Sequence, residues 1–179
     1  LNLCNDFGVV AAHLKKSGLA GLQSITLTVG VPLQVMLALK EKTVSSAFER
    51  VGRPAALEYK LDGFRLQIHK SKDVIRLFTR RLENVTARFP DVVAALANVP
   101  ENVILDCEVV GVVGGKFVPF QEISQRIKRK HDIAAVASQL PVQVYVFDVL
   151  FYQQSVLHLS CGERRALLES VIKENDVLK

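Results

Sequence analysis

The chain has 179 residues, 49% of them hydrophobic, which is enough for one globular domain of ordinary size. Its formal net charge of +5 agrees with a polyanionic partner without identifying one, because a modest basic excess is common. The three cysteines are widely spaced and form no C-x-x-C pair, which argues against a disulfide framework and a zinc site. No apolar run approaches the ~20 residues of a membrane span, so we expect no membrane partner.

The amino-terminal region predicts one short helix and a linker. Asn5-Asp6 supplies a side chain suited to an N-cap for a helix that runs to about Lys16, and Gly18 is a plausible stop. Residues 21–38 alternate apolar and polar positions only briefly before Gly30 breaks the pattern. We interpret this stretch as a linker that leads into a second domain.

A helix and three strands are expected next. Residues 43–50 form a candidate helix with a threonine or serine cap, and strands are predicted at 55–61, 64–69 and 74–79. Asp62-Gly63 lies between the first two strands and predicts a tight β-hairpin turn. That hairpin would bring Lys60 close to Arg65.

The second half of the chain alternates helices with apolar strands. Its predicted elements are a helix at 91–97, a hairpin of 103–113 and 116–118 around Gly114-Gly115, helices at 120–130 and 132–140, a buried strand at 142–152, and a helix from the Ser160–Glu163 capping box to about Lys173. Antiparallel hairpins separated by helices indicate an α+β fold, not an alternating parallel sheet.

The chemistry is concentrated in residues 57–70, LEYKLDGFRLQIHK. Here Lys60 lies between two carboxylates, Glu58 and Asp62, and Arg65 follows. A free lysine amine has a pKa of about 10.4, so a nucleophilic lysine needs a nearby cation, a metal ion or desolvation. Arg65 would also suit a phosphate, which a guanidinium binds with two parallel hydrogen bonds. Taken without further matches, four such charges are more often a solvated strand edge with cross-strand ion pairs.

The residues 58–65, E-Y-K-L-D-G-F-R, resemble the E-x-K-x-D-G-x-R signature of ATP-dependent DNA ligases of the archaeal and eukaryotic type. The resemblance implies an α+β fold of antiparallel sheets with inserted and flanking helices, an incomplete ATP-grasp-like nucleotidyltransferase (adenylation) domain. Residues 1–30 would be the end of the DNA-binding domain and the linker, and residues 31–179 the first part of the adenylation domain. The only methionine is Met36, so we expect the chain to be a piece of a longer protein.

Four later segments match the family in its order: L-F-T-R-R at 77–81, I-L-D-C-E at 104–108, V-F-D at 146–148 and E-R-R-A-L-L at 163–168. Cys107 stands where the family usually has glycine. The last two family motifs, which carry further lysines, do not occur before Lys179. We therefore expect this fragment to adenylate itself poorly or not at all.

The resemblance also implies a role for each site residue. Lys60 would be the catalytic nucleophile that forms the phosphoramide with AMP. In nucleotide binding, Glu58 would contact the adenine edge, Arg65 the ribose or phosphate, Arg80 the phosphates or the nick, Phe147 would stack on the base, and Glu108 would contact the ribose and hold the metal.

The implied reaction uses ATP as the AMP donor and Mg²⁺ to seal nicks in duplex DNA during replication, repair and recombination. The protein would be a monomer, contact a sliding clamp only through parts outside this chain, and reside in the cytoplasm at the nucleoid, or in the nucleus of a eukaryote. An RNA ligase or mRNA capping-type nucleotidyltransferase is an alternative, and so is a catalytically silent DNA-binding module. The basic residues of 126–130 would follow DNA phosphates or form one charged helix face.

Overall fold

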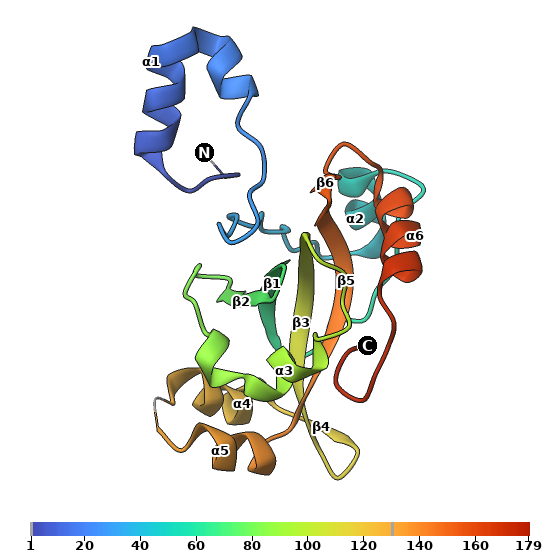
Figure 1. Ribbon diagram of the computed structural model, residues 1–179. Coiled ribbons are helices and arrows are strands. Elements are labelled where there is room, and N and C mark those ends of the chain that lie inside the picture. Colours follow the sequence, from blue (N-terminus) through green and yellow to red (C-terminus); the bar gives the residue numbers. More distant parts are fainter. Residues whose placement is uncertain (1, 130) are drawn as a thin grey trace.

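The computed structural model describes residues 2–129 and 131–179 (Figure 1). One antiparallel sheet of six strands forms its centre, in the order β2-β1-β3-β5-β6, with β4 paired to β3. The strands are β1 (Phe64–Ser71), β2 (Val74–Thr79), β3 (Val103–Val113), β4 (Lys116–Val118), β5 (Val142–Tyr152) and β6 (Gln154–Ser155). The predicted α+β class is confirmed.

Helices cover one face of this sheet (Figure 1). They are α3 (Pro90–Ala95), α4 (Phe120–Lys128) and α6 (Cys161–Val171), with α5 (Ile133–Gln139) beside α4 and the 3₁₀ turn η1 (Thr86–Arg88) before α3. Val92, Ile123 and Leu168 anchor the three covering helices in the core. This face alternates apolar residues along each strand, as a half-buried strand requires. The larger of the two hydrophobic clusters therefore lies on the helical side.

The amino-terminal linker crosses the opposite face of the sheet. Leu27 and Leu33 are buried there against Ile104 and Leu150. The Leu33 N–H donates to Gln67 Oε1 over 3.0 Å, and Gln67 Nε2 donates to the Leu33 carbonyl over 2.6 Å. The buried Gln67 amide thus pairs with both the N–H and the carbonyl of Leu33, as the backbone of a neighbouring strand would.

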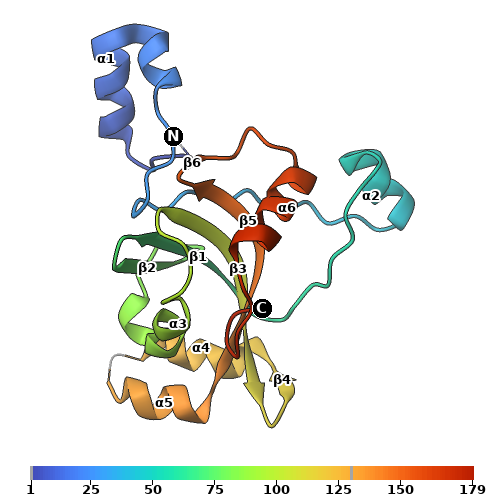
Figure 2. The same cartoon turned by 45° about the vertical axis from the view of Figure 1, so that its right-hand side comes forward.

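Two helices lie away from the sheet. The helix α1 (Phe7–Gln23) begins at the predicted Asp6 cap, whose Oδ1 accepts from the Val9 N–H over 3.0 Å. The predicted stop at Gly18 is a kink instead, and the helix resumes beyond it. The helix α2 (Val44–Val51) has the predicted Thr43 cap and stands at the end of two extended segments (Figure 2). None of the described helices is long and apolar enough to cross a membrane.

The predicted strand at residues 55–61 is wrong. These residues form no strand, and the chain enters the sheet only at Phe64. Because β1 pairs with β2 along one edge and with β3 along the other, β1 has no free edge with which residues 55–61 could form a hairpin. The hairpin expected at Asp62-Gly63 is therefore absent, and the hairpin of this region is β1–β2.

Candidate functional site

A cleft of about 1290 Å³ opens where the segment before β1, the end of β2 and α4 meet. Lys60 reaches it from the irregular segment, Arg65 from β1, Arg80 from the residues after β2, and Glu108 from β3. Four of the six predicted site residues therefore line one cleft. Three further cations line it as well: Arg81, Arg88 and Lys128.

Two contacts hold the segment that carries Lys60 against the sheet and α4. Gly63 packs so closely on β3 that a Cβ at this position would lie 2.2 Å from the Val109 carbonyl oxygen. Asp62 Oδ2 accepts from the Phe120 N–H at the start of α4 over 3.3 Å. Only glycine fits the first contact, and the second satisfies a free N–H of the helix terminus. The D-G pair thus positions Lys60 without forming the predicted turn.

Arg65 is held by Asp106 from the neighbouring strand. Arg65 Nε donates to Asp106 Oδ1 over 2.8 Å, and Nη2 donates to the second carboxylate oxygen. The Asp106 hydrogen bond raises the pKa of Arg65, while burial raises the pKa of Asp106 against the opposing effect of the guanidinium. The same guanidinium lies 5.3 Å from the centroid of the Phe147 ring. One bidentate pair therefore fixes a cation between the cleft and the aromatic residue.

Glu108 lies directly opposite Arg65 in the register of β1 and β3. Burial raises the pKa of its carboxyl group, and the positive charges of Lys60 and Arg65 act against that shift. The carboxylate is half-buried. The sequence prediction placed Lys60 and Glu108 at one site, and the structure brings them together.

Of the remaining predicted residues, two lie outside the cleft lining and one lies on its wall. Phe147 is half-buried in β5, where the register with β3 shifts between Asp106 and Cys107, and it does not belong to the cleft lining. Glu58 is exposed and does not line the cleft either. Arg80 is exposed on the cleft wall, without an ion pair among the described residues.

The interpretation of residues 126–130 as a run of phosphate-binding cations is wrong for Arg126. This side chain is 2% exposed, pairs with Asp91 over 2.6 Å and 2.9 Å, and lies 4.6 Å from the Phe89 ring centroid. Helical periodicity turns it toward the core while Lys128 and Arg129 stay exposed. Lys130 lies outside the described residues.

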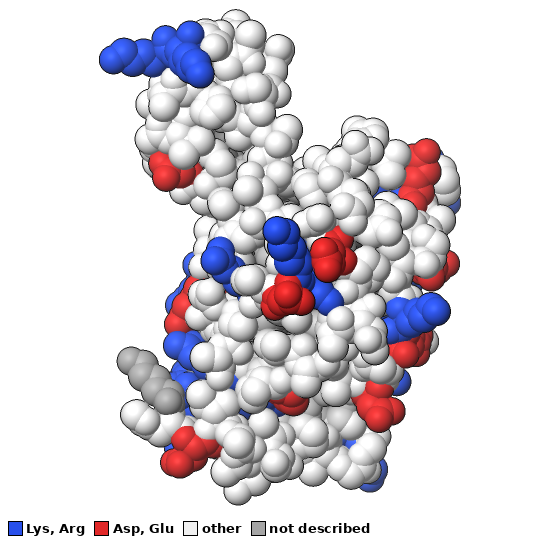
Figure 3. Space-filling model, in the orientation of Figure 1, with Lys and Arg blue, Asp and Glu red and all other residues white. Residues whose placement is uncertain are grey.

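Sequence reasoning noticed Asp106 but gave it no role. A charged residue on an apolar strand was a usable signal, since a buried carboxylate requires a partner. The sequence marked Lys128 only as part of the basic run and Arg81 only as part of the L-F-T-R-R match, and no signal marked the half-buried Arg88. On the side of the molecule shown in Figure 3, basic and acidic side chains lie interspersed between uncharged areas.

A metal site made by protein ligands alone is not found. Within residues 2–129 and 131–179, no three His, Cys, Asp or Glu side chains form a group that could hold a metal ion. Glu108 is the carboxylate on the cleft wall nearest in register to Arg65. Any divalent cation here would need most of its ligands from water and substrate.

Known proteins resemble this chain along nearly its whole length. It is 48% identical over 176 residues to a DNA ligase of Nanoarchaeum equitans, covering 96% of this chain and 31% of that protein. It is 39% identical over 178 residues to a DNA ligase of Archaeoglobus fulgidus, covering 99% of this chain and 32% of that protein. The chain therefore spans about a third of the length of these relatives.

Solved structures and a family model agree with these relatives. The ligase domain from M. tuberculosis LigD matches with a TM-score of 0.51 and 27% identity over 63% of this chain and 35% of that one. A mycobacterial DNA ligase D complexed with ATP and MES matches with a TM-score of 0.50 and 29% identity, over the same shares of the two chains. The model of the ATP dependent DNA ligase domain matches residues 35–178. With its lysine, arginine and glutamate assembled on one cleft, this chain belongs to the ATP-dependent DNA ligase domain family.

Proposed function

We propose that this chain carries the nucleophile of an ATP-dependent DNA ligase, which seals nicks in duplex DNA through a lysyl-AMP intermediate. One observation carries the proposal: Lys60 and Arg65, from one short segment, and Glu108, from β3, line a single cleft. Family membership supports the same activity, and the relatives are named DNA ligases. The proposed domain division is at residue 30, with the adenylation domain after it.

The first step transfers AMP from ATP to the protein. The neutral Lys60 amine attacks the α-phosphorus, an N–P bond forms, the P–O bond to pyrophosphate breaks, and the amine loses a proton. Arg65 orients the nucleotide, because Asp106 holds its guanidinium in a fixed plane. Positioning and charge supply most of the catalysis in such an in-line displacement.

The two later steps act on the nick. The AMP moves from Lys60 to the 5′-phosphate, which breaks the N–P bond and restores the amine. The 3′-hydroxyl then attacks this phosphate, forms the new phosphodiester bond and expels AMP. Arg80 would neutralise the phosphates of the nucleotide or the nick, and its exposure on the cleft wall supports this role.

Base recognition is proposed for Phe147 and Glu58. The Phe147 ring contributes an apolar surface beside Arg65, and stacking of a base on such a ring is worth about 1–3 kcal/mol. Glu58 would contact the adenine edge only after its segment closes toward the cleft, since the side chain is outside the lining.

Magnesium is the proposed metal, with Glu108 as its protein ligand. Mg²⁺ keeps several waters and takes one or two carboxylates together with phosphate oxygens. The half-buried Glu108 carboxylate on the cleft wall fits this demand as a single hard ligand. When bound, the ion would neutralise phosphate charge. The predictions of a monomer and of a clamp contact outside this chain remain predictions.

The test uses the full-length protein, incubated with ATP and Mg²⁺ and weighed by mass spectrometry. We expect a mass gain of one AMP that is absent in Lys60→Ala and unchanged in Lys72→Ala, a control outside the cleft lining. A nicked DNA duplex should then be sealed. No mass gain in the wild type would refute the enzyme, and adenylation that transfers only to RNA ends would indicate an RNA ligase.

A further inference from the structure

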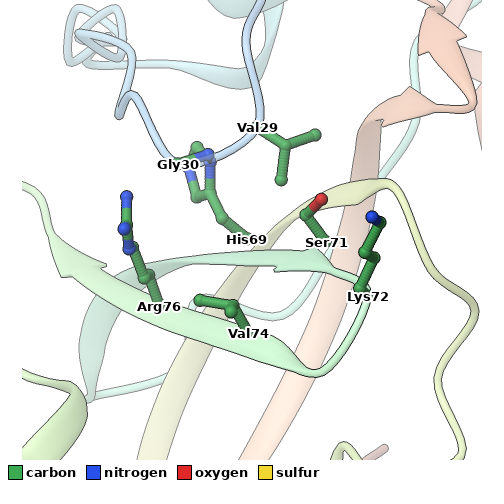
Figure 4. Close-up of a pocket in the computed structure, with 7 residues that line it drawn as sticks. All are labelled: Val29, Gly30, His69, Ser71, Lys72, Val74 and Arg76. Carbon is green, nitrogen blue, oxygen red and sulfur yellow. Dashed lines mark hydrogen bonds between the residues drawn. The ribbon is translucent and has the colours of Figure 1, made fainter.

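A second, smaller pocket lies between the amino-terminal linker and the β1–β2 hairpin (Figure 4). Its volume is about 400 Å³, within the range of ordinary ligand sites. Val29 and Gly30 form its linker side, and His69, Ser71, Lys72, Val74 and Arg76 form its hairpin side. The lining thus contains two cations, a hydroxyl group and no carboxylate.

Both cations are available to a ligand. Lys72 and Arg76 are exposed, and neither makes an ion pair among the described residues. Arg65, Arg126 and Arg164, in contrast, are each engaged by an aspartate. In Figure 4 the Lys72 side chain rises from the turn of the hairpin and the Arg76 side chain from within β2, on the same side of the hairpin as Gly30. An anion in the pocket would therefore meet positive charge from two sides.

The wall of the pocket is built around the linker backbone. The Gly30 N–H donates to His69 Nδ1 over 3.0 Å, and His69 pairs directly with Arg76 across the hairpin. Gly30 has a φ of +93°, and a Cβ there would lie 2.9 Å from Arg76 Nη1. A side chain at residue 30 would thus push the guanidinium aside. Glycine at this position lets Arg76 lie against the linker.

Arg65, which lines the Lys60 cleft, and His69 and Ser71, which line the pocket, lie on the same face of β1. Arg65, Gln67, His69 and Ser71 alternate onto this face of β1, and the linker covers the middle two. Six residues separate Arg65 from Ser71, which is about 20 Å along a strand. Duplex DNA carries one phosphate per ~3.4 Å along each strand. A duplex seated at the cleft is long enough to pass the pocket.

We propose that this pocket binds a backbone phosphate of duplex DNA through Lys72 and Arg76, away from the nick. The proposal rests on the proposed function, because duplex DNA is the partner that the cleft would bring to this face. The shared chemistry is that of a phosphate anion, whether from a polynucleotide or free in solution. The amino-terminal linker and the β1–β2 hairpin would thus help to hold duplex DNA at this pocket.

The test measures binding of the protein to an unnicked duplex by fluorescence anisotropy over a series of salt concentrations. The slope of log K against log[salt] is negative, and each lost phosphate contact should make it less steep by about one. At 0.1 M salt this corresponds to a loss of affinity on the order of tenfold. We expect this change in Lys72→Ala/Arg76→Ala. The control Arg165→Ala/Lys173→Ala removes two exposed charges, one in α6 and one just after it, and should leave the slope near the wild-type value. An unchanged slope in the first variant, or an equal change in both, overturns the site.

Two further measurements separate the possible causes. Inorganic phosphate at millimolar concentration should not displace the duplex, and competition that depends on Lys72 and Arg76 would instead indicate a free-phosphate site and overturn the assignment. Adenylation of Lys60 by ATP should be the same in the wild type and the double variant. Its absence from both would refute the proposed enzyme, while the binding measurement would still decide the pocket.

Discussion

Arg65 and Asp106 form a bidentate ion pair across β1 and β3, with the carboxylate 2% exposed and the guanidinium at the edge of the Lys60 cleft. The guanidinium lies 5.3 Å from the centroid of the Phe147 ring, so one contact between two strands holds a cation beside an aromatic surface. Arg65 is thereby held in place before any nucleotide arrives.

Asp106→Asn should slow the formation of lysyl-AMP on the order of 10²-fold, because the guanidinium loses one of its two hydrogen bonds and its fixed orientation. A mass-spectrometric time course of adenylation measures this rate. Asp91→Asn is the control, since it weakens another buried arginine pair, that of Arg126, on the helical side. An Asp106→Asn rate equal to that of the wild type would contradict the positioning role.

Gly63→Ala should destabilise the protein and abolish adenylation, because its Cβ would lie 2.2 Å from the Val109 carbonyl oxygen and would displace the Lys60 segment. Differential scanning calorimetry gives the change in Tm, and the mass assay gives adenylation. Gly162→Ala in α6 meets no atom within 4 Å and should be neutral or slightly stabilising. Gly63→Ala with normal Tm and activity would show that the close approach has no consequence.

Acid should destabilise the fold through His69. Burial, and secondarily the charge of Arg76, lowers the pKa of this imidazole from 6.5 to about 4. The unfolded chain therefore binds the proton first as the pH falls. The contribution to stability is complete above pH 6.5 and is lost between 6.5 and 4, by about 3 kcal/mol at most.

Urea unfolding at pH 7.5 and pH 5 tests this prediction. The loss of unfolding free energy between the two pH values should be larger in the wild type than in His69→Gln, which cannot titrate. Asp106 and Glu108 also titrate with raised pKa values, but they are common to both proteins and cancel in the comparison. An equal pH dependence in the two proteins would exclude His69 as the cause.

Arg126→Ala should lower the free energy of unfolding by about 3–5 kcal/mol, since it removes a buried cation and leaves Asp91 without its partner. Lys128→Ala, two residues away and exposed on the cleft wall, should leave stability unchanged and weaken binding of duplex DNA. Chemical denaturation and anisotropy measure the two effects. If Arg126→Ala weakened DNA binding without lowering stability, Arg126 would be a phosphate-binding cation of the basic run and not a buried structural residue.

Local patterns determined most of the secondary structure. The caps at Asp6, Thr43 and Ser160 are present as predicted, because an N-cap depends only on residues within one helical turn. The strand at 103–113 and the Gly114-Gly115 turn are also confirmed, with both glycines at positive φ. The predicted strand at 55–61 failed because strand pairing depends on which edges of the sheet are free.

The sequence by itself determined the family and the residue types of the site, since the spacing of Glu58, Lys60 and Arg65 is a property of one short segment. Only the tertiary structure decided that Asp106 holds Arg65, that Arg126 is buried while Lys128 is exposed, and that Glu58 lies outside the cleft. The physical reason is that burial and pairing arise from residues distant in sequence. Whether a charged side chain is buried in an ion pair or exposed in the cleft therefore depends on which neighbours the fold places beside it.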